Sequence, residues 1–252
     1  MNTEIEGIIA LWKRELIRFF RSPSRIIGSL AMPFFFLAIL GTGLNGAFNI
    51  PGMQGNYLEF IAPGIIGMVL MFGSMFSGIT VIMDRQFGFL KETLVAPISR
   101  FSIVAGKALG GATTSIIQGA LIMVISVFLG VQLQITNIIL LAAFMFLISI
   151  MFVALGIAIA SMLEDMHGFQ LIMNFLIMPL FFLSGALFPL SSAPDLLKAV
   201  SLLDPLTYGV NGLRYILLGH SDISFPICFA VITAFTAAFV AIAIFLFNRI
   251  EE

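Results

Sequence analysis

The stretch from Asp84 to Arg100 reads Asp-Arg-Gln-Phe-Gly-Phe-Leu-Lys-Glu-Thr-Leu-Val-Ala-Pro-Ile-Ser-Arg and interrupts an otherwise apolar chain. It holds five charged residues, whereas the windows Phe60–Met83 and Ala108–Leu163 on either side hold none. Each window is long enough to cross a bilayer, which takes about 20 apolar residues. The stretch is therefore predicted to be a short amphipathic helix at the membrane surface, able to receive force from a partner. A plain solvated loop is the alternative.

Wound as a helix, this stretch has two faces. The first is predicted to anchor the helix and holds Phe87, Leu90 and Leu94. The second is predicted to meet a partner and holds Arg85, Phe89 and Glu92. Pro97 lacks the amide hydrogen that a helix interior needs, so the helix is expected to end near Val95 or Ala96.

The composition is that of an integral membrane protein. Sixty per cent of the 252 residues are hydrophobic, 10% are charged, and the mean hydropathy is +1.12. Soluble domains have about 25% charged residues. We expect an all-α fold, with one transmembrane domain over residues 1–252. A single cysteine, Cys228, rules out an intramolecular disulfide.

Charge-free windows predict six transmembrane helices, because the longest window must hold two of them. The expected spans are 26–46, 60–83, 103–130, 136–163, 168–190 and 224–247. An even number places both termini on one side. The side follows from Lys and Arg, which favour the cytoplasm: ten fall in segments on the side of the termini, and only Lys198 and Arg214 fall on the other. Both termini and the 84–100 helix are therefore predicted to be cytoplasmic.

Residues 4–21 predict an amphipathic helix that lies along the membrane interface within the N-terminal segment 1–25. Its apolar side chains, Trp12 among them, fall within about 120° of arc at 100° per residue. Arg14, Arg18 and Arg21 point the other way, toward anionic lipid or a protein.

The loop between the fifth and sixth spans is interrupted by prolines, which predict two short helices at about 194–203 and 205–218. Neither is long enough to cross the bilayer. We expect both to dip into the outer leaflet or to cap the bundle as re-entrant elements.

No catalytic, metal or nucleotide site is predicted. Gly106-Lys107 resembles the end of a phosphate-binding loop, but Phe101 stands where its first glycine is needed. The turn Glu164–His167 lacks the paired histidines of zinc proteases. The uncharged polar residues inside the spans are Gln118, Gln170 and Asn174, for which interhelical hydrogen bonds and a place in the substrate path are both open.

Two stretches resemble one family. Asp84–Arg100 is similar to the cytoplasmic coupling loop of type-2 ABC exporter permeases, in particular the daunorubicin-resistance-like group. Leu183-Ser184-Gly185-Ala186-Leu187-Phe188-Pro189, followed by Asp204-Pro205-Leu206-Thr207-Tyr208 and by Arg214, resembles the second signature of that family. Asp204 stands where Asn is frequent, and Gly88-Phe89-Leu90 replaces the commoner Gly-Thr-Leu.

The resemblance implies a permease subunit that dimerises with a second copy and binds two separate ATPase subunits in the plasma membrane. ATP and Mg would be held by those partners, not by this chain, and no nucleic acid would be involved. ATP binding would push the coupling helices and open an exit path for a hydrophobic or amphipathic substrate, such as a drug, a lipid or a lipid-linked glycan.

Two other classes fit less well. A secondary transporter needs ion ligands within the membrane or broken helices in both halves, and only the fifth predicted span is broken. An intramembrane enzyme needs polar residues that converge at one depth. No Asp, Glu, Lys or Arg falls near the centre of a predicted span, where a charge costs about 2.5–3.5 kcal/mol or more.

Overall fold

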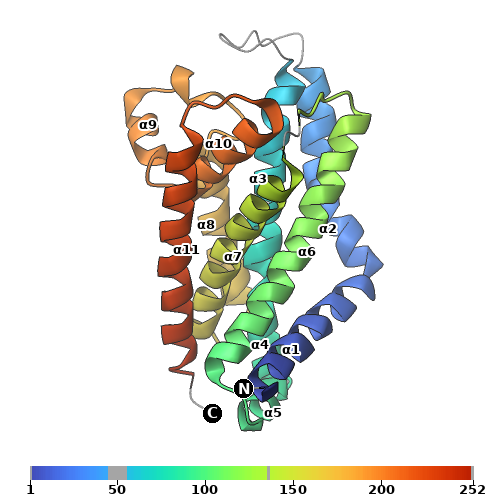
Figure 1. Cartoon of the computed structure of the whole chain (residues 1–252), viewed down its shortest axis with the longest axis vertical. Coiled ribbons are helices and arrows are strands. Elements are labelled where there is room, and N and C mark those ends of the chain that lie inside the picture. Colours follow the sequence, from blue (N-terminus) through green and yellow to red (C-terminus); the bar gives the residue numbers. More distant parts are fainter. Residues whose placement is uncertain (1, 45–55, 135–136, 251–252) are drawn as a thin grey trace.

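The computed structural model describes residues 2–44, 56–134 and 137–250. These residues form a helical bundle without a β-strand, so the predicted all-α class is confirmed (Figure 1). The helices follow in chain order as α1 Asn2–Phe20, α2 Pro23–Phe35, the π-helix η1 Phe36–Gly41, α3 Tyr57–Ser77, α4 Ile79–Gln86, α5 Phe89–Val95, α6 Arg100–Phe128, α7 Ile138–Met162, α8 Met166–Leu183, the short 3₁₀ turn η2 Leu190–Ser192, α9 Asp195–Ser201, α10 Pro205–Leu218 and α11 Phe225–Phe247.

Five segments of the described chain are long and apolar enough to cross a membrane. They are Tyr57–Gln86, Arg100–Phe128, Ile138–Met162, Met166–Leu183 and Phe225–Phe247. The first predicted span, 26–46, differs, because the apolar helix Ile26–Gly41 that corresponds to it is shorter than these five segments. The predicted end of that span at residue 46 and the predicted start of the fourth span at residue 136 both lie outside the described residues.

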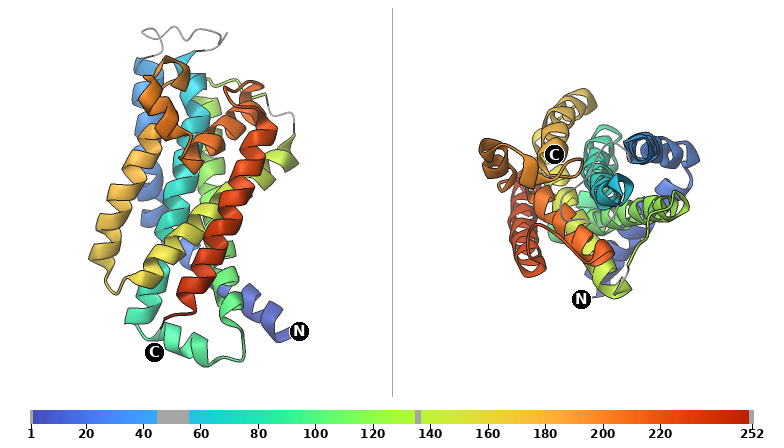
Figure 2. Two further views of the ribbon diagram at one scale, coloured as in Figure 1. Left: turned by 90° about the vertical axis from the view of Figure 1, so that its left-hand side faces the viewer. Right: turned by 90° about the horizontal axis from the view of Figure 1, so that it is seen from above.

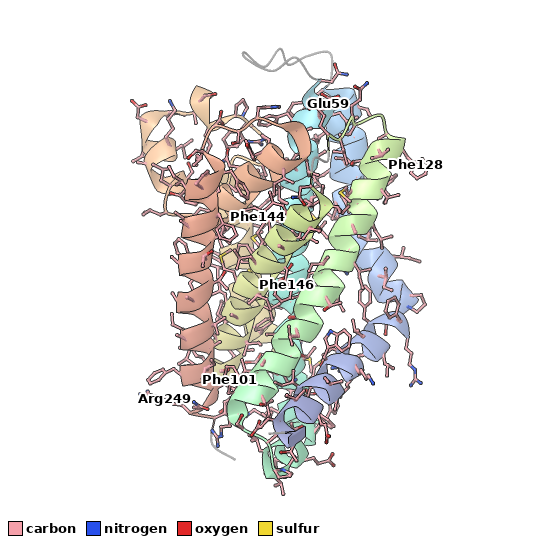
Figure 3. All side chains as sticks on the ribbon, in the orientation of Figure 1. Glu59, Phe101, Phe128, Phe144, Phe146 and Arg249 are labelled. Carbon is pink, nitrogen blue, oxygen red and sulfur yellow. The ribbon has the colours of Figure 1, made fainter. Side chains whose placement is uncertain are left out.

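Charged side chains gather at the two ends of the bundle, with a mostly apolar belt between them. Glu59 lies near one end and Arg249 near the other, while Phe128 and Phe101 point outward from α6 (Figure 3). Phe128 is 85% exposed and Phe101 is 55% exposed. Such exposed aromatic residues on a long apolar helix are those expected to face lipid.

Helix α3 is the centre of the bundle. It contacts α6, α7, α8 and α10, and most of its residues are buried, Tyr57 to Met71 almost without interruption. Burial among lipid tails gives little hydrophobic driving force between helices, so close packing has to hold the bundle together. Small residues allow that approach: a Cβ at Gly78 would collide with the carbonyl oxygen of Gly156 on α7, and one at Gly64 would collide with Ala186.

The two ends of the bundle carry different short helices. Helices α1, α4 and α5 meet at the end where α11 finishes, and α9 and α10 cover the opposite end (Figure 1, Figure 2). The predicted outer helices at 194–203 and 205–218 correspond to α9 and α10. Helix α10 is buried over most of its length, whereas α9 leaves Leu196 76% exposed.

Candidate functional site

A buried carboxylate, Asp84, joins three helices at the end of the bundle that carries α5. Asp84 lies near the end of α4 and is 2% exposed. Arg14 of α1 donates to both of its oxygens, at 2.7 and 3.0 Å, and the ammonium of Lys107 on α6 binds the same carboxylate. Bidentate charged hydrogen bonds of this kind are among the strongest in proteins. The carboxylate therefore links α1, α4 and α6.

Arg14 extends this link to α5. Its guanidinium carbon lies 3.5 Å from the centre of the Phe89 ring, a cation–π contact. Leu90, next in sequence, is only 2% exposed and joins the buried core. We call the set Arg14, Asp84, Lys107 and Phe89 the inner cluster.

The sequence prediction of one helix from Asp84 to about Val95 is wrong. The chain breaks at Gly88, whose φ of +77° is a left-handed conformation that glycine adopts without strain, and α5 begins afresh at Phe89. The break exchanges the buried and exposed sides that a continuous helix would give Phe87 and Phe89. Phe87, predicted to anchor the helix, is 74% exposed, whereas Phe89, predicted to face a partner, covers Arg14.

The other predicted coupling residues lie on both sides of α5. Leu94 is half-buried and packs against the core, Glu92 and Pro97 are exposed, and α5 ends at Val95, before Pro97 as predicted. Arg85 lies 3.7 Å from the exposed carboxylate of Glu164, in the turn between α7 and α8. The amide of Gln86 donates to the Glu164 carbonyl at 3.1 Å, so this turn supports the start of the loop.

Helix α1 packs against α6 instead of lying only on lipid. Trp12 donates from Nε1 to the Thr113 hydroxyl at 3.1 Å, and Gly106 and Gly110 of α6 give α1 room to approach. The predicted outward direction of the arginines is therefore wrong for Arg14, which the buried Asp84 draws inward. Arg18 is half-buried against Met83, while Arg21 is exposed.

A second contact fixes α1 to the start of α6. The Glu4 carboxylate accepts hydrogen bonds from the backbone amide of Ser99 at 3.0 Å and from the hydroxyls of Ser99 and Ser102. These bonds, with that from Ser102 first, lower the pKa of Glu4.

At the opposite end, residues of the second signature pack against one another. Arg214 is 2% exposed, its guanidinium carbon lies 4.1 Å from the centre of the Phe60 ring, and Nη2 donates to the Gly185 carbonyl at 3.1 Å. Ser184 and Gly185 are buried in the turn after α8, and Gly185 has a φ of +70°. Pro189 is half-buried just before η2. Arg214 thus ties this turn to α3 and α10.

Asp204 begins α10. Its Oδ1 accepts from the amide of Leu206 at 2.8 Å, Pro205 holds the first position of the helix, and Tyr208 donates to the Leu202 carbonyl at 2.9 Å. Burial raises the pKa of Asp204 to about 7, against the lowering effect of the Leu206 bond. A raised carboxyl pKa gives stability that is complete below the ordinary value near 4 and is lost as pH rises through about 7.

The three polar residues expected inside the spans do not converge. Gln118 donates to Ser29 of α2 at 2.7 Å, an interhelical hydrogen bond. Gln170 and Asn174 lie one helical turn apart on the exposed surface of α8. Within the described ranges no three His, Cys, Asp or Glu side chains come together as a metal site. Asp165 of the Glu164–His167 turn instead begins α8, where it accepts from the Gly168 amide at 2.6 Å.

Sequence reasoning missed the inner cluster because it treated Lys107 only as the end of a failed phosphate loop. A usable signal was present. Asp84 and Lys107 carry opposite charges at the same end of two consecutive long apolar segments, so antiparallel helices bring them to one depth.

The two signatures at opposite ends of the bundle, and the helices from α1 to α10, fall within or overlap a segment that matches a known family. Residues 6–218 match the model of the ABC-2 type transporter. The chain belongs to the ABC-2 type transporter family. This match confirms the resemblance drawn from Asp84–Arg100 and Leu183–Pro189.

Several curated relatives of this ABC-2 chain are named transport permeases. A putative transport permease ycf38 of Cyanophora paradoxa is 37% identical over 221 residues, which cover 86% of this chain and 76% of that protein. The inner membrane transport permease YadH of Escherichia coli K12 is 27% identical over 95% of this chain and 94% of its own. Nodulation protein J of Rhizobium leguminosarum bv. trifolii is 27% identical over 84% of this chain and 81% of its own. The chain is thus a multi-pass membrane permease subunit of an ABC transporter, and not itself an enzyme.

Proposed function

We propose that this ABC-2 permease exports a hydrophobic or amphipathic substrate and takes its energy from a separate ATPase subunit, which holds ATP and Mg. The inner cluster carries the proposal, because Asp84 fixes α1 and α4 to α6 and Phe89 joins α5 to them through Arg14. A push on α5 would therefore move α6 as well. Drugs, lipids and lipid-linked glycans are the proposed substrate classes.

The proposed ATPase contact is Phe87, the exposed side of α5 that follows it, and the groove beside α5. Phe87 and Val95 are 74% and 81% exposed, the sort of apolar side chains that fill pockets of a partner. A groove of about 470 Å³ runs between α1 and α5, and its charged lining residues are Glu6 and Glu92. A basic segment of the ATPase fits this acidic groove.

Co-purification with the ATPase tests this contact. Glu92→Arg places a positive charge in the groove and is expected to reduce both capture of the ATPase and substrate-stimulated ATP turnover at least fivefold, because like charges across an interface repel. Lys91→Glu, at the exposed neighbouring position, is the matched control. It changes the side-chain charge by the same amount as Glu92→Arg, in the opposite direction. Wild-type capture and turnover by Glu92→Arg would refute the acidic-groove contact.

The proposed orientation has six spans in the plasma membrane, with Ile26–Gly41 as the first and both termini in the cytoplasm. Its support is the bias of Lys and Arg toward the end with α1 and α5.

Labelling from outside intact cells tests the orientation. A membrane-impermeant thiol reagent should label Lys198→Cys on α9 and should not label Gln86→Cys at the end of α4. The unmodified chain, whose Cys228 is fully buried, is the control. Labelling of Gln86→Cys alone would reverse the orientation.

The proposed assembly is a homodimer bound to two ATPase subunits, with α2 and α8 at the seam. Helix α8 leaves Phe175 87% exposed and also exposes Gln170 and Asn174. An amide facing hydrocarbon lacks a hydrogen-bond partner, which makes such a surface costly unless protein covers it. A second copy supplies that cover.

Cross-linking tests the dimer. Asn174→Cys is expected to form a disulfide-linked dimer in membranes under mild oxidation, whereas Val124→Cys on the exposed side of α6 should remain monomeric. Both positions are exposed and lie on apolar helices. Equal cross-linking of the two variants would mean random collision and would argue against α8 as the seam.

A further inference from the structure

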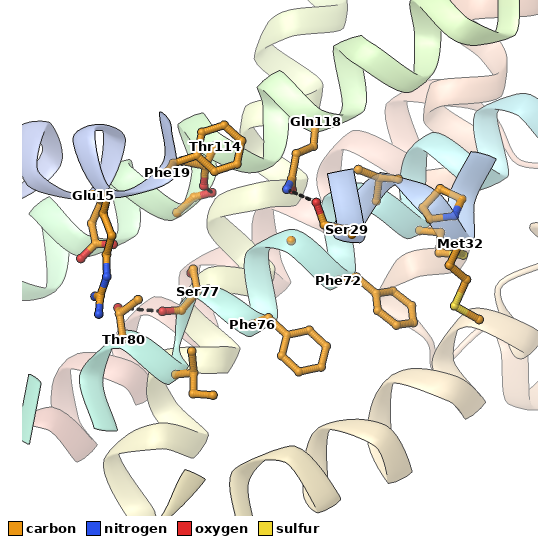
Figure 4. A pocket seen from close by; sticks show the side chains of 18 of the residues that line it. Glu15, Phe19, Ser29, Met32, Phe72, Phe76, Ser77, Thr80, Thr114 and Gln118 are labelled. Atoms are coloured by element: carbon orange, nitrogen blue, oxygen red, sulfur yellow. Dashed lines mark hydrogen bonds between the residues drawn. The ribbon is translucent and has the colours of Figure 1, made fainter. Parts of the chain in front are cut away.

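A cavity of about 510 Å³ lies between α1, α2, α3, α4 and α6, and none of the residues of the inner cluster or of the groove beside α5 lines it (Figure 4). Its volume is within the range of small-molecule sites, about 300–1,000 Å³. The part of the wall supplied by α3 and α4 runs from Met68 to Met83, about 22 Å of helix rise. The cavity therefore extends from the end of the bundle that carries α1 toward its middle.

One end of the cavity is polar. Glu15 of α1 lies there with Ser77 and Thr80 (Figure 4). Arg18, one helical turn after Glu15 on α1, also lines the cavity. The Glu15 side chain is only 11% exposed, and neither its Oε1 nor the Nη1 of Arg18 has a hydrogen-bond partner within the described chain. Arg14 Nη1 is 3.9 Å from Glu15, too far for a hydrogen bond, and Arg14 is held by Asp84.

Both charged groups thus have unused hydrogen-bonding capacity in a confined space. A buried charge without a partner is costly, and a ligand that supplies the opposite charge removes that cost. A single anion would satisfy Arg18 but would face the carboxylate of Glu15. A single cation would satisfy Glu15 but would face the guanidinium of Arg18.

The other end of the cavity is apolar. Phe72, Phe76 and Met32 lie in its wall, with the Gln118–Ser29 hydrogen bond between the two ends (Figure 4). Pro33 and Met68 also line the cavity. Methionine side chains adapt to chains of different shape. This wall suits an alkyl or acyl chain.

We propose that this cavity binds an amphiphile whose headgroup carries both an ammonium and an anionic group, the ammonium at Glu15, the anion at Arg18 and the chain along Phe72 and Phe76. Phosphoethanolamine lipids have this chemistry. That the bound amphiphile is also the cargo rests on the proposed transport function. Binding of the amphiphile is measured on the permease alone. A negative result in the ATPase capture test of Glu92→Arg would therefore leave this binding test valid.

Native mass spectrometry of the delipidated permease in an uncharged detergent tests the site. The probes are dioctanoyl phosphatidylethanolamine with both charges, dioctanoyl phosphatidylglycerol with the anion only, and dodecylamine with the cation only. The first is expected to bind one to one and at least about tenfold more tightly than the other two, since each charged hydrogen bond is worth about one factor of ten or more.

Two substitutions separate the charges. Glu15→Gln should remove the preference for phosphatidylethanolamine over phosphatidylglycerol, and Arg18→Gln should weaken both lipids about tenfold while leaving dodecylamine unchanged. A general loss of structure would not divide the probes in this way. Lys13→Gln on the same helix and Arg21→Gln directly after its end, both at exposed positions, are the controls and should change nothing.

A third substitution closes the cavity without touching either charge. Gly28 lines the cavity, and a Cβ there would meet no atom within 4 Å, so Gly28→Phe can be accommodated and should block all three probes. Gly43 is equally open but does not line the cavity, which makes Gly43→Phe the matched control. Equal binding of both lipids to the unmodified permease, or full lipid binding by Gly28→Phe, would overturn the proposal.

Discussion

Replacing Asp84 by alanine is expected to destabilise the permease by about 3–5 kcal/mol, the largest loss for any single substitution considered. Lys107 is 4% exposed, and Asp84 is the acceptor of its only ion pair in the described residues. Without the carboxylate an ammonium remains buried and unpaired, which is the costly outcome for a buried ion pair. The measurement is the thermal stability of the detergent-purified protein, read by size-exclusion chromatography after heating.

A double substitution separates stability from coupling. Asp84→Leu with Lys107→Met removes both buried charges and keeps the volume, and such replacements are often neutral or stabilising. We expect thermal stability to recover. ATP turnover should stay uncoupled from transport, because Arg14 has lost the anchor that joins α1 and α5 to α6.

Asp195→Ala is the matched control for Asp84→Ala. Asp195 also pairs with a lysine, Lys198, at 3.7 Å, but both side chains are exposed. The expected change is within about 0.5 kcal/mol. If Asp84→Ala melted at the same temperature as Asp195→Ala, the buried cluster would not hold the helices together.

The sequence predicts the helices of this protein well because their signals are local. Long charge-free windows place α6, α7 and α11 to within a few residues, and prolines delimit α9 and α10. Element positions depend on hydropathy and on residues that end helices, and both can be read along one chain.

What the sequence does not predict is the direction of individual side chains. A single α-helical periodicity placed Phe87 inward and Phe89 outward, and one left-handed residue, Gly88, reversed the two. The inward direction of Arg14 depends on a carboxylate 70 residues away. Such contacts follow from tertiary packing, which overrides the pattern of any one segment.

The second large prediction uses this corrected pair of phenylalanines. Phe87→Ala is expected to weaken capture of the ATPase by about 2 kcal/mol, roughly 30-fold, because an exposed aromatic that fills a partner pocket carries much of an interface's energy. Its removal should leave thermal stability unchanged, since Phe87 is 74% exposed. The measurement is the affinity of the purified permease for the ATPase subunit.

Phe89→Ala is the matched substitution two residues away, and it should show the reverse pattern. Loss of the ring removes the cation–π contact with Arg14, worth about 0.5–2 kcal/mol, together with packing against the core. Thermal stability should therefore fall, while the permease molecules that remain folded should bind the ATPase with little loss of affinity.

If Phe89→Ala abolished capture of the ATPase at full thermal stability and Phe87→Ala left capture intact, the face predicted from the sequence would be the binding face. Arg14 would then have to release Phe89 when the ATPase binds. Stable protein and undiminished capture for both variants would remove α5 from the interface, and transmission would then have to pass through α1 and the groove beside Glu6.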